Sequence, residues 1–414
     1  MDAPRLRGVE AFPMEQDGQR FIALRDPAGY TDSILMLPGP LVDIVALFDG
    51  EHSIVDIQAE IARRYNGEIV PRGDIEKIID MLDEHGFLDG ERFAARQASI
   101  DGAFLAASTR PASHAGGAYP GEATALRTTM DGFFTHAEGP GPIAWSARPR
   151  TPDVAGIIAP HIDFHRGGPA YAWAYREVAE RCAADVFVVV GTCHAGMRHP
   201  FALTRKDYDT PLGPARVNVD FVEALARRAK QDCFGSELAH RNEHSIEFQA
   251  VFLQYLYGAR QDVTVVPILA SFAHEAMMRR RRPTDDARVG RFLDALRETI
   301  AHTGGRVALV AGADLAHMGT RFGDPNPISA AERQEIERED RLMLETVEAG
   351  DANAFFDRVA ADEDRRRICG LSPIYAVLHA LGGRRGALKR YGMWPEPEGI
   401  VSYASVVFDH GSAS

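Results

Sequence analysis

Three apolar runs of the chain are each followed closely by a histidine. The histidines are His161, His194 and His317, and the runs before them are 154–159, 186–190 and 307–311. Short continuous apolar runs are typical of strands buried on both faces of a parallel sheet, and ligands of such sheets bind beyond the carboxyl ends of the strands. A lone histidine in such a place is usually a hydrogen-bonded loop residue. Three that fall independently at one edge predict a shared metal or acid–base site.

Cys369 adds a sulfur to these possible ligands. Ser372 and Pro373 follow it in the order typical of an N-cap and a first helical residue, which predicts a helix from there to about Leu381. A thiol near a helix N-terminus feels partial positive charge, so we expect a lowered pKa and a metal-binding thiolate. The alternative is a small buried cysteine that packs under the helix, and spacing alone does not decide between the two.

The segment Glu243-His244-Ser245-Ile246-Glu247 supplies further polar groups at an expected helix start. His244 and Glu247 are three residues apart and share one face of a helix. The segment is not a His-Glu-x-x-His zinc motif, because the second histidine is missing. We expect either a hydrogen-bonded pair that lines the site or a pair that only caps the helix.

Two imidazoles and a thiolate are donors that suit iron(II), copper or zinc. Iron(II) with three protein ligands would leave positions for substrate and dioxygen, whereas zinc with open positions would suggest hydrolysis through a bound water. Copper(I) is also well served by thiolate, which makes metal handling an alternative to catalysis. The donors by themselves leave iron(II), copper and zinc open.

Strands and helices in alternation must position these groups. A further apolar run occurs at 263–269, an alternating pattern typical of a last strand occurs at 399–408, and helical patterns occur at 222–230 and 246–257. Such alternation from about residue 150 onward predicts an α/β domain with a mainly parallel central sheet flanked by helices.

The first 95 residues have a different pattern, which predicts a small winged-helix-like α+β domain. Apolar residues recur at helical spacing over 41–48, and residues 53–56 resemble the capping box of a second helix. Asp74 is expected to cap a third helix that Gly86 closes. The segment 87–93 resembles the short hairpin wing that would follow.

Composition bounds the classes of protein that need be considered. The chain has 414 residues, of which 45% are hydrophobic and 25% charged, and a formal net charge of −13. Its apolar content excludes general disorder, and no apolar run approaches the roughly 18 residues of a membrane span. Residues 1–100 hold 10 Lys and Arg against 19 Asp and Glu, a balance of −9 that argues against nucleic-acid binding. The 4 cysteines are too few for a disulfide scaffold, so we expect a cytoplasmic location.

Seven short motifs occur in a fixed order over about residues 111–410. They are Ser113-His114-Ala115-Gly116, Ala159-Pro160-His161, Gly191-x-x-His194, Glu243-His244-Ser245-Ile246-Glu247, Asp314-x-x-His317, Cys369-Gly370 and Val401-Ser402-Tyr403-Ala404. In this order the chain resembles the MEMO family. The resemblance implies a fold similar to that of the LigB-type extradiol dioxygenases, which are non-haem iron enzymes. On that ground we expect iron(II) as the metal, with copper and zinc as the other candidates. Bacterial members are labelled protein B of the AmmeMemoRadiSam system, which implies a radical-SAM protein and an AMMECR-type protein as partners.

The resemblance also assigns roles to single residues. Carried over position by position, it puts metal ligands at His161, His194 and Cys369. Asp314 and His317 fall beside them, with His317 where the related dioxygenases keep a catalytic acid–base histidine.

Some other pocket positions of the family are matched in this sequence, and some differ from the family pattern. His114, His244 and Glu247 match pocket positions of the family, and we count the last two among the candidate catalytic residues. The sequence departs from the family pattern after His161, where it adds Asp163 and His165, and at Cys193. These departures leave the three ligands intact and bear on which substrate the pocket accepts.

The N-terminal domain resembles the PqqD-like domains that recognise peptides beside radical-SAM enzymes, and the alternative is a generic three-helix docking or dimerisation module. We predict this domain over residues 1–95, a linker rich in alanine and serine over 96–112, and the metal-binding α/β domain over 113–411.

Three functional hypotheses follow. The first is an oxidoreductase-like enzyme with one redox metal, in which His317 transfers protons and Asp314 orients it. The second is a non-catalytic metal- or peptide-binding adaptor whose N-terminal domain docks a radical-SAM partner. A zinc hydrolase is the third, disfavoured by the missing His-Glu-x-x-His motif.

Overall fold

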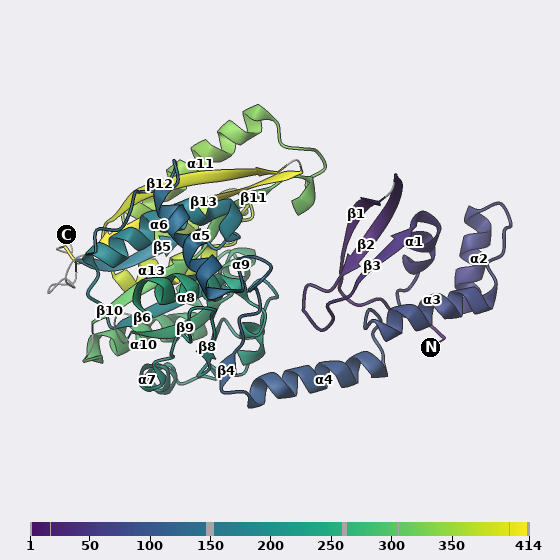
Figure 1. The fold of residues 1–414 in the computed structure, drawn as a ribbon, viewed down its shortest axis with the longest axis horizontal. Coiled ribbons are helices and arrows are strands. Elements are labelled where there is room, and N and C mark those ends of the chain that lie inside the picture. The colour runs from purple at the N-terminus through teal and green to yellow at the C-terminus, as the bar shows by residue number, and fades with distance from the viewer. Residues whose placement is uncertain are drawn as a thin grey trace. The chain divides into compact units, whose positions relative to one another are not determined.

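The computed structural model describes residues 2–16, 18–145, 153–258, 263–304, 306–396 and 398–411. The chain forms two compact units, Met1–Ala106 and Ala107–Ser414 (Figure 1). Each unit encloses a hydrophobic core of its own. Among the described residues, no helix combines the length and the apolar character that crossing a membrane requires.

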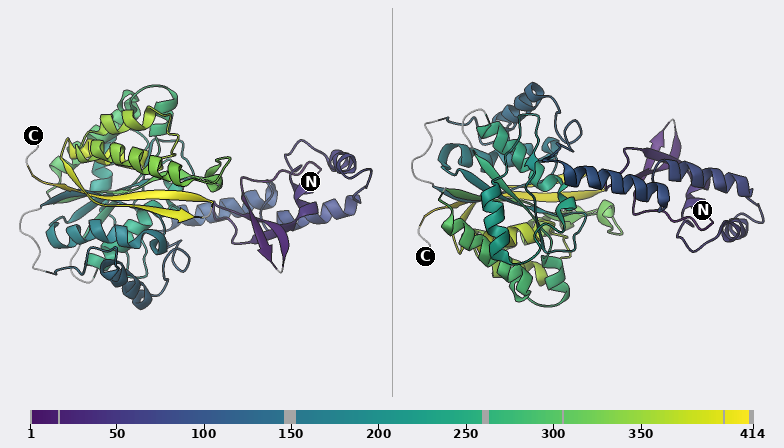
Figure 2. Two further views of the ribbon diagram at one scale, coloured as in Figure 1. Left: turned by 90° about the horizontal axis from the view of Figure 1, so that it is seen from above. Right: turned by 90° about the horizontal axis from the view of Figure 1, so that it is seen from below.

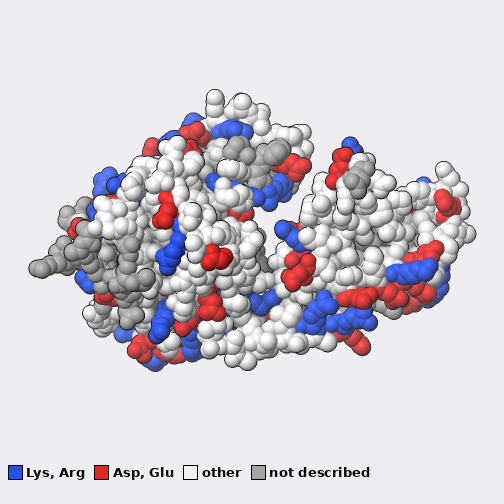
Figure 3. Space-filling model, viewed as in Figure 1, with Lys and Arg blue, Asp and Glu red and all other residues white. Residues whose placement is uncertain are grey.

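The first unit is an antiparallel sheet followed by four helices. Its elements are β1 (Glu10–Gln16), β2 (Gln19–Arg25), β3 (Ile34–Pro38), α1 (Gly39–Val45), α2 (Ile54–Arg64), α3 (Arg72–Glu84) and α4 (Glu91–Ala106), with the strands in the order β1-β2-β3. Acidic and basic side chains are intermixed over α3 and α4 (Figure 3), and neighbours such as Lys77 and Asp74 form ion pairs. The unit is therefore α+β.

Local sequence signals in this unit were only partly correct. The capping box of α2 is confirmed, because Ser53 and Asp56 each accept from the other's backbone N–H. Asp74 is not the cap of α3, since the helix begins at Arg72, one residue after Pro71, and Asp74 lies in its first turn.

The expected hairpin wing over residues 87–93 is wrong. Leu88 pairs with Leu6 of the N-terminal segment, and Glu91 already begins α4. This helix continues to Ala106, into residues that we had predicted to be linker. Alanine is the strongest helix former, so a segment rich in alanine extends the helix once Phe93 and Phe104 have buried their rings.

The second unit is built on an eight-stranded sheet with helices on both faces (Figure 2). The strand order is β11-β13-β5-β10-β6-β9-β7, and β12 pairs with β13. The strands are β5 (Val154–Ala159), β6 (Val186–Thr192), β7 (Phe201–Leu203), β9 (Thr264–Ala270), β10 (Val307–Gly312), β11 (Asp314–Met318), β12 (Gly386–Glu396) and β13 (Gly399–Asp409), and the short strands β4 (Thr109–Arg110) and β8 (Asp207–Tyr208) form a separate pair.

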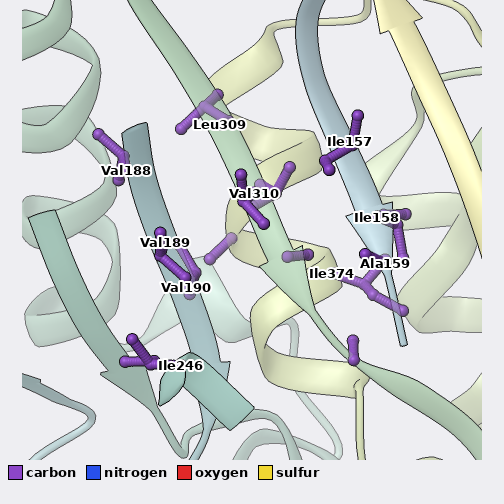
Figure 4. Close-up of a cluster of buried hydrophobic side chains, with 14 of the residues drawn as sticks. Ile157, Ile158, Ala159, Val188, Val189, Val190, Ile246, Leu309, Val310 and Ile374 are labelled. Atoms are coloured by element: carbon purple, nitrogen blue, oxygen red, sulfur yellow. The ribbon is translucent and has the colours of Figure 1, made fainter. Parts of the chain in front are cut away.

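The parallel character is confined to the centre of the sheet. The four strands β5, β10, β6 and β9 are parallel to one another, while β13, β11, β12 and β7 join antiparallel. The expectation of an α/β fold is confirmed, and the sheet is mixed rather than mainly parallel. The central strands are buried on both faces, as their apolar runs predicted (Figure 4).

The helices of the second unit are mostly longer than the strands they cover. They are α5 (Ala123–Thr135), α6 (Phe164–Arg181), α7 (Val219–Ala229), α8 (His244–Tyr257), α9 (Ala273–Met278), α10 (Ala287–His302), α11 (Ala330–Glu348), α12 (Ala352–Ala360) and α13 (Leu371–Leu381). Ile246 of α8 and Ile374 of α13 are fully buried and join the cluster of valines and isoleucines on the central strands (Figure 4). The N-termini of these two helices therefore reach the sheet.

Strand register brings the predicted site residues to one edge. Gly312 of β10 lies opposite Ala159 of β5 on one side and opposite Gly191 of β6 on the other. The three strands are parallel, so their carboxyl ends are level. The residues that follow them, which include His161 and His194, leave the sheet at the same edge.

Candidate metal centre

Two imidazoles and one thiol meet at the carboxyl edge of the central strands. One ligand atom from each of His161, His194 and Cys369 lies within 4.8 Å of the other two. The Cys369 Sγ is 3.2 Å from His161 Nε2, and the two imidazole rings are 4.9 Å apart. Segments more than 30 residues apart in the chain thus present two nitrogens and a sulfur to one point.

His161 is held in the orientation that a metal ligand needs. Its Nδ1 lies 2.9 Å from the carbonyl oxygen of Gly312, to which it donates a proton, so Nε2 keeps its lone pair and faces Cys369. Its backbone N–H donates to Asp314 Oδ1 at 2.9 Å. Burial, together with the neighbouring His194, lowers the pKa of His161 to about 3, so the ring is neutral.

His194 is held by the carboxylate of Glu243. Nδ1 of His194 lies 3.0 Å from one carboxylate oxygen and 3.1 Å from the other, and the backbone N–H of His194 donates to Oε2 at 2.9 Å. Burial alone would raise the pKa of Glu243, but the charge of His194 and the hydrogen bonds from it lower that pKa well below its usual value. An ionised carboxylate on Nδ1–H fixes the tautomer whose Nε2 can bind a metal.

Glu243 is the functional residue that our reading of the sequence missed. It had been noted only as the first residue of the Glu243–Glu247 motif. Its side chain also caps α8, accepting from the N–H of Ser245 at 3.0 Å, and 4% of the residue is exposed. Glutamate is not among the preferred N-cap residues, so no local signal in the sequence marked this role.

Cys369 precedes α13, although not in the way we expected. The helix begins at Leu371 with Gly370 as its N-cap, and the Ser372 hydroxyl instead accepts from the backbone N–H groups of Phe272 and Ala273. Burial and the charge of Asp314 raise the pKa of the Cys369 thiol well above its usual value, which corrects our expectation of a lowered one. Desolvation outweighs the helix dipole here, and a bound cation would be needed to favour the thiolate.

His244 lies against both predicted histidine ligands. Its ring stacks on His194 with centroids 4.6 Å apart, and meets His161 edge-on at 5.2 Å. His194, Glu243 and His244 also bring ligand atoms within 4.8 Å of one another. We interpret this second set as residues that hold His194 in place and not as a second metal site, because the Glu243 carboxylate already accepts from His194 and from Ser245.

Glu247 does not pair with His244, and this expectation is wrong. Its fully buried carboxylate accepts from Arg110, from Tyr119 and from His114, whose Nδ1 is 2.9 Å away and whose backbone N–H is 3.0 Å away. Burial alone would raise the pKa of Glu247, but Arg110 lowers it to about 2. Glu247 therefore anchors His114, whose ring lies 5.6 Å from that of His244.

Asp314 and His317 lie on β11, the strand that follows β10. Asp314 is 1% exposed, and burial raises its pKa to about 6 even though the charge of His317 opposes this. His317 Nδ1 is 3.1 Å from the carbonyl of Leu315, and its ring meets Phe322 edge-on at 5.2 Å. Burial lowers the pKa of His317, and Asp314 acts in the opposite direction.

The remaining predicted pocket residues differ in their surroundings. Asp163 is the N-cap residue of α6, and one of its oxygens lies 3.8 Å from Arg166. His165 is exposed, with Nε2 3.2 Å from Arg166 Nε. Cys193 is buried beside His194, and burial raises its pKa to about 12. None of the three belongs to the groups of possible ligands found among the described residues.

Comparison with known proteins gives a consistent set of matches. The Memo-like protein family matches residues 110–407, a span that contains all the site residues described above. A MEMO1 family protein from Aquifex aeolicus is 29% identical over 405 residues, which cover 97% of this chain and 99% of that protein. One from Methanopyrus kandleri is 29% identical over 310 residues, 72% of this chain and 98% of its own length. One from Thermus thermophilus is 26% identical over 334 residues, 81% of this chain and 91% of its own length.

Proposed function

The chain belongs to the Memo-like protein family, and on this premise we propose that its second unit is an oxidoreductase with a single redox metal held by His161, His194 and Cys369. The observation that carries the proposal is the orientation of the two imidazoles. Gly312 and Glu243 each accept the Nδ1 proton of one ring, so Nε2 is the atom of each ring that would bind an ion. Burial alone would lower the pKa of His194, but Glu243 raises it, so an ion would displace a proton from Nε2 of His194.

We propose iron(II) as the metal because of the resemblance to the LigB-type enzymes, since the donor set by itself does not favour iron(II) over copper or zinc. Two nitrogens and a sulfur also suit copper, and a zinc hydrolase is less well supported because the His-Glu-x-x-His motif is missing. When bound, such an iron would supply one-electron chemistry and open positions for substrate and dioxygen, as in the LigB-type dioxygenases that the family resembles. The thiol in place of a carboxylate is the main departure from those enzymes.

The protein's own groups would bind and position the substrate. His244 and His114, which are 28% and 27% exposed, form one wall beside the ligands. His317 on β11 would hold or release a proton. Asp314, which also accepts from the backbone N–H of His161, would favour the protonated form of His317 through its negative charge. His161, Asp314 and Gly370 are buried, whereas Cys369 is half-buried and His194 is exposed, so the open side of the site lies toward His194.

Anaerobic reconstitution with iron(II) tests the metal site. We expect one iron per chain in the wild-type protein and loss of that iron in H194A. The matched control is H199A, because His199 is partly exposed and bonds to Ser236 outside the ligand group. Full iron content in H194A, or equal losses in both variants, would contradict the proposed ligands.

Oxygen uptake tests the reaction class. The reconstituted protein, supplied with catechol-type and thiol-containing compounds, should consume dioxygen with at least one of them, and H317A should retain iron while losing most of the uptake. Iron binding without uptake by any compound tested would favour the adaptor role.

A docking role for the first unit is the second candidate function. That unit has its own core, and the match to the Aquifex aeolicus protein extends over it because 97% of the chain is covered. We propose that it binds a radical-SAM or AMMECR-type partner, or a peptide that such a partner modifies. Pull-down with the full chain and with residues 1–106 removed tests this, and partner binding that persists after the removal would contradict it.

A further inference from the structure

The loop that delivers Cys369 is held in an unusual backbone conformation. It connects α12 to α13, and Glu363, Asp364 and Arg367 have φ angles of 56°, 53° and 53°. Residues other than glycine seldom adopt this left-handed region, and such strain persists only where surrounding contacts enforce it. The contacts that enforce it here therefore also decide where Cys369 lies.

We propose that Asp364 and Asp340, two buried carboxylates outside the ligand set, are positioning residues that fix the Cys369 thiol against His161. Asp364 acts within the loop, and Asp340 acts from α11 through Arg366. The role in metal binding rests on the proposed function, whereas the positioning of the thiol does not.

Asp364 ties the loop together directly before the thiol. The residue is 7% exposed, and its Oδ1 accepts from the backbone N–H of Ile368 at 2.7 Å. Its other oxygen lies 2.7 Å from His274 Nε2 on α9, and its carbonyl accepts from the N–H of Arg367 at 2.8 Å. The carboxylate thus joins α9 to the residue that precedes Cys369.

Asp340 holds the same loop from the opposite side. Its fully buried carboxylate pairs with Arg366, whose side chain is 5% exposed. The second oxygen of Asp340 accepts from Ser402 at 2.5 Å and from Tyr391 at 3.0 Å, so β12 and β13 brace it. Breaking such a buried pair leaves an uncompensated charge, so the pair resists displacement of the loop.

The Arg366 segment also carries the contacts that hold β11. Its carbonyl accepts from the N–H of His317 at 2.8 Å, and the neighbouring Arg367 donates to the carbonyl of His317 at 2.9 Å. The Ser402 hydroxyl accepts from the N–H of Ala316 at 2.9 Å. One polar network therefore sets the position of His317 together with that of the thiol.

The ends of the Cys369 peptide are fixed to the sheet edge. The Thr192 hydroxyl donates to the carbonyl of Cys369 at 2.9 Å, and the N–H of Gly370 donates to the carbonyl of Asp314 at 3.0 Å. These bonds hold the residue after the thiol, and Asp364 holds the residue before it. Removing Asp364 takes away the side-chain contact to Ile368, the residue directly before Cys369.

Alkylation of Cys369 in the metal-free protein tests the positioning directly. In D364G the carboxylate is lost while the left-handed backbone remains unstrained, because glycine adopts it readily. In D364N one acceptor oxygen remains for Ile368. We expect Cys369 to react with iodoacetamide about ten-fold faster in D364G, since local opening exposes the thiol, and close to the wild-type rate in D364N.

D340N tests the second carboxylate in the same assay. We expect faster alkylation of Cys369, and S402A, which removes only the Ser402 contacts to Asp340 and Ala316, provides a milder variant if D340N fails to fold. The control L126A removes a fully buried side chain of α5 and lowers stability without touching the loop. Unchanged alkylation of Cys369 in D364G and in the Asp340 or Ser402 variant, or an equal increase in L126A, would overturn the proposal.

Cobalt(II) titration separates this inference from the proposed function. We expect D364G to lose about ten-fold or more in cobalt affinity, with a weaker sulfur-to-cobalt absorption, while L126A keeps both. A wild-type protein that binds no cobalt would count against the proposed metal centre. The alkylation rates would still decide whether Asp364 and Asp340 position the thiol.

Discussion

Replacing Glu243 with glutamine should weaken metal binding without unfolding the protein. The carboxylate accepts from the backbone N–H of His194 at 2.9 Å, from its Nδ1 at 3.0 Å and from the N–H of Ser245 at 3.0 Å. A glutamine has a single acceptor oxygen, so it cannot satisfy all three donors. An amide group turned toward Nδ1 would favour the tautomer with its proton on Nε2, which is unable to bind a metal.

The size of the effect follows from the contact that is lost. A hydrogen bond to a charged group contributes about 1.5–3 kcal/mol. Loss of that contribution to the ligand orientation should raise the metal Kd about ten- to hundred-fold, the range typical of residues that support metal-bound histidines. Loss of the cap on α8 should also lower the free energy of unfolding by about 1 kcal/mol.

The assay is a cobalt(II) or zinc(II) titration against a competing coloured chelator, with thermal unfolding followed in parallel. E122Q is the matched control, because Glu122 caps α5 by accepting from Thr124 and Ala125 at 2.9 and 2.8 Å and belongs to neither ligand group. Both variants should lose a similar amount of stability, and only E243Q should lose affinity. An unchanged Kd in E243Q, or equal losses of affinity in the two variants, would refute the tautomer argument.

Three further predictions concern other parts of the second unit. C369S should be purified with little metal while its thermal unfolding stays near that of the wild type, which metal analysis and calorimetry would check; full metal content would exclude the thiol as a ligand. Because the pKa of Glu247 is lowered to about 2, its ion pair with Arg110 should stabilise the fold above about pH 4.5 and lose this effect as the pH falls toward 2, a change of about 3 kcal/mol. Urea unfolding at several pH values should therefore show that the free energy of unfolding of E247Q falls less steeply below pH 4.5 than that of the wild type. Equal dependence on pH in the two proteins would contradict the lowered pKa of Glu247. G312A should be destabilised by about 1–3 kcal/mol, because a Cβ there would lie 2.3 Å from a carbonyl oxygen of α8. G132A, with open space around a residue inside α5, should be more stable than the wild type by about 0.5–1 kcal/mol in chemical denaturation.

The central strands and β13 could be predicted from sequence, but the other strands could not. The runs that became β5, β6, β9 and β10 are continuously apolar, because both of their faces are covered by helices, and β13 was marked by its alternating pattern. The sequence of β12 mixes charged, aromatic and glycine residues, so no periodicity marked it. The prediction of a hairpin wing at residues 87–93 was wrong because a short apolar pattern fits a helix start as well as a hairpin.

The sequence by itself determined which groups reach the site and at which edge. Continuously apolar runs predict strands of one parallel sheet, and the carboxyl ends of such strands share an edge, so His161 and His194 were expected at the same edge. The structure added that β10 lies between the two strands that precede them. The tertiary structure decided how those groups behave. That Glu247 turns to Arg110 and not to His244, that burial raises the pKa of Cys369, and that a buried pair on α11 braces the thiol loop all depend on contacts between segments far apart in the chain. Desolvation and hydrogen bonding depend on that packing, so they cannot be predicted from the spacing of residues along the chain.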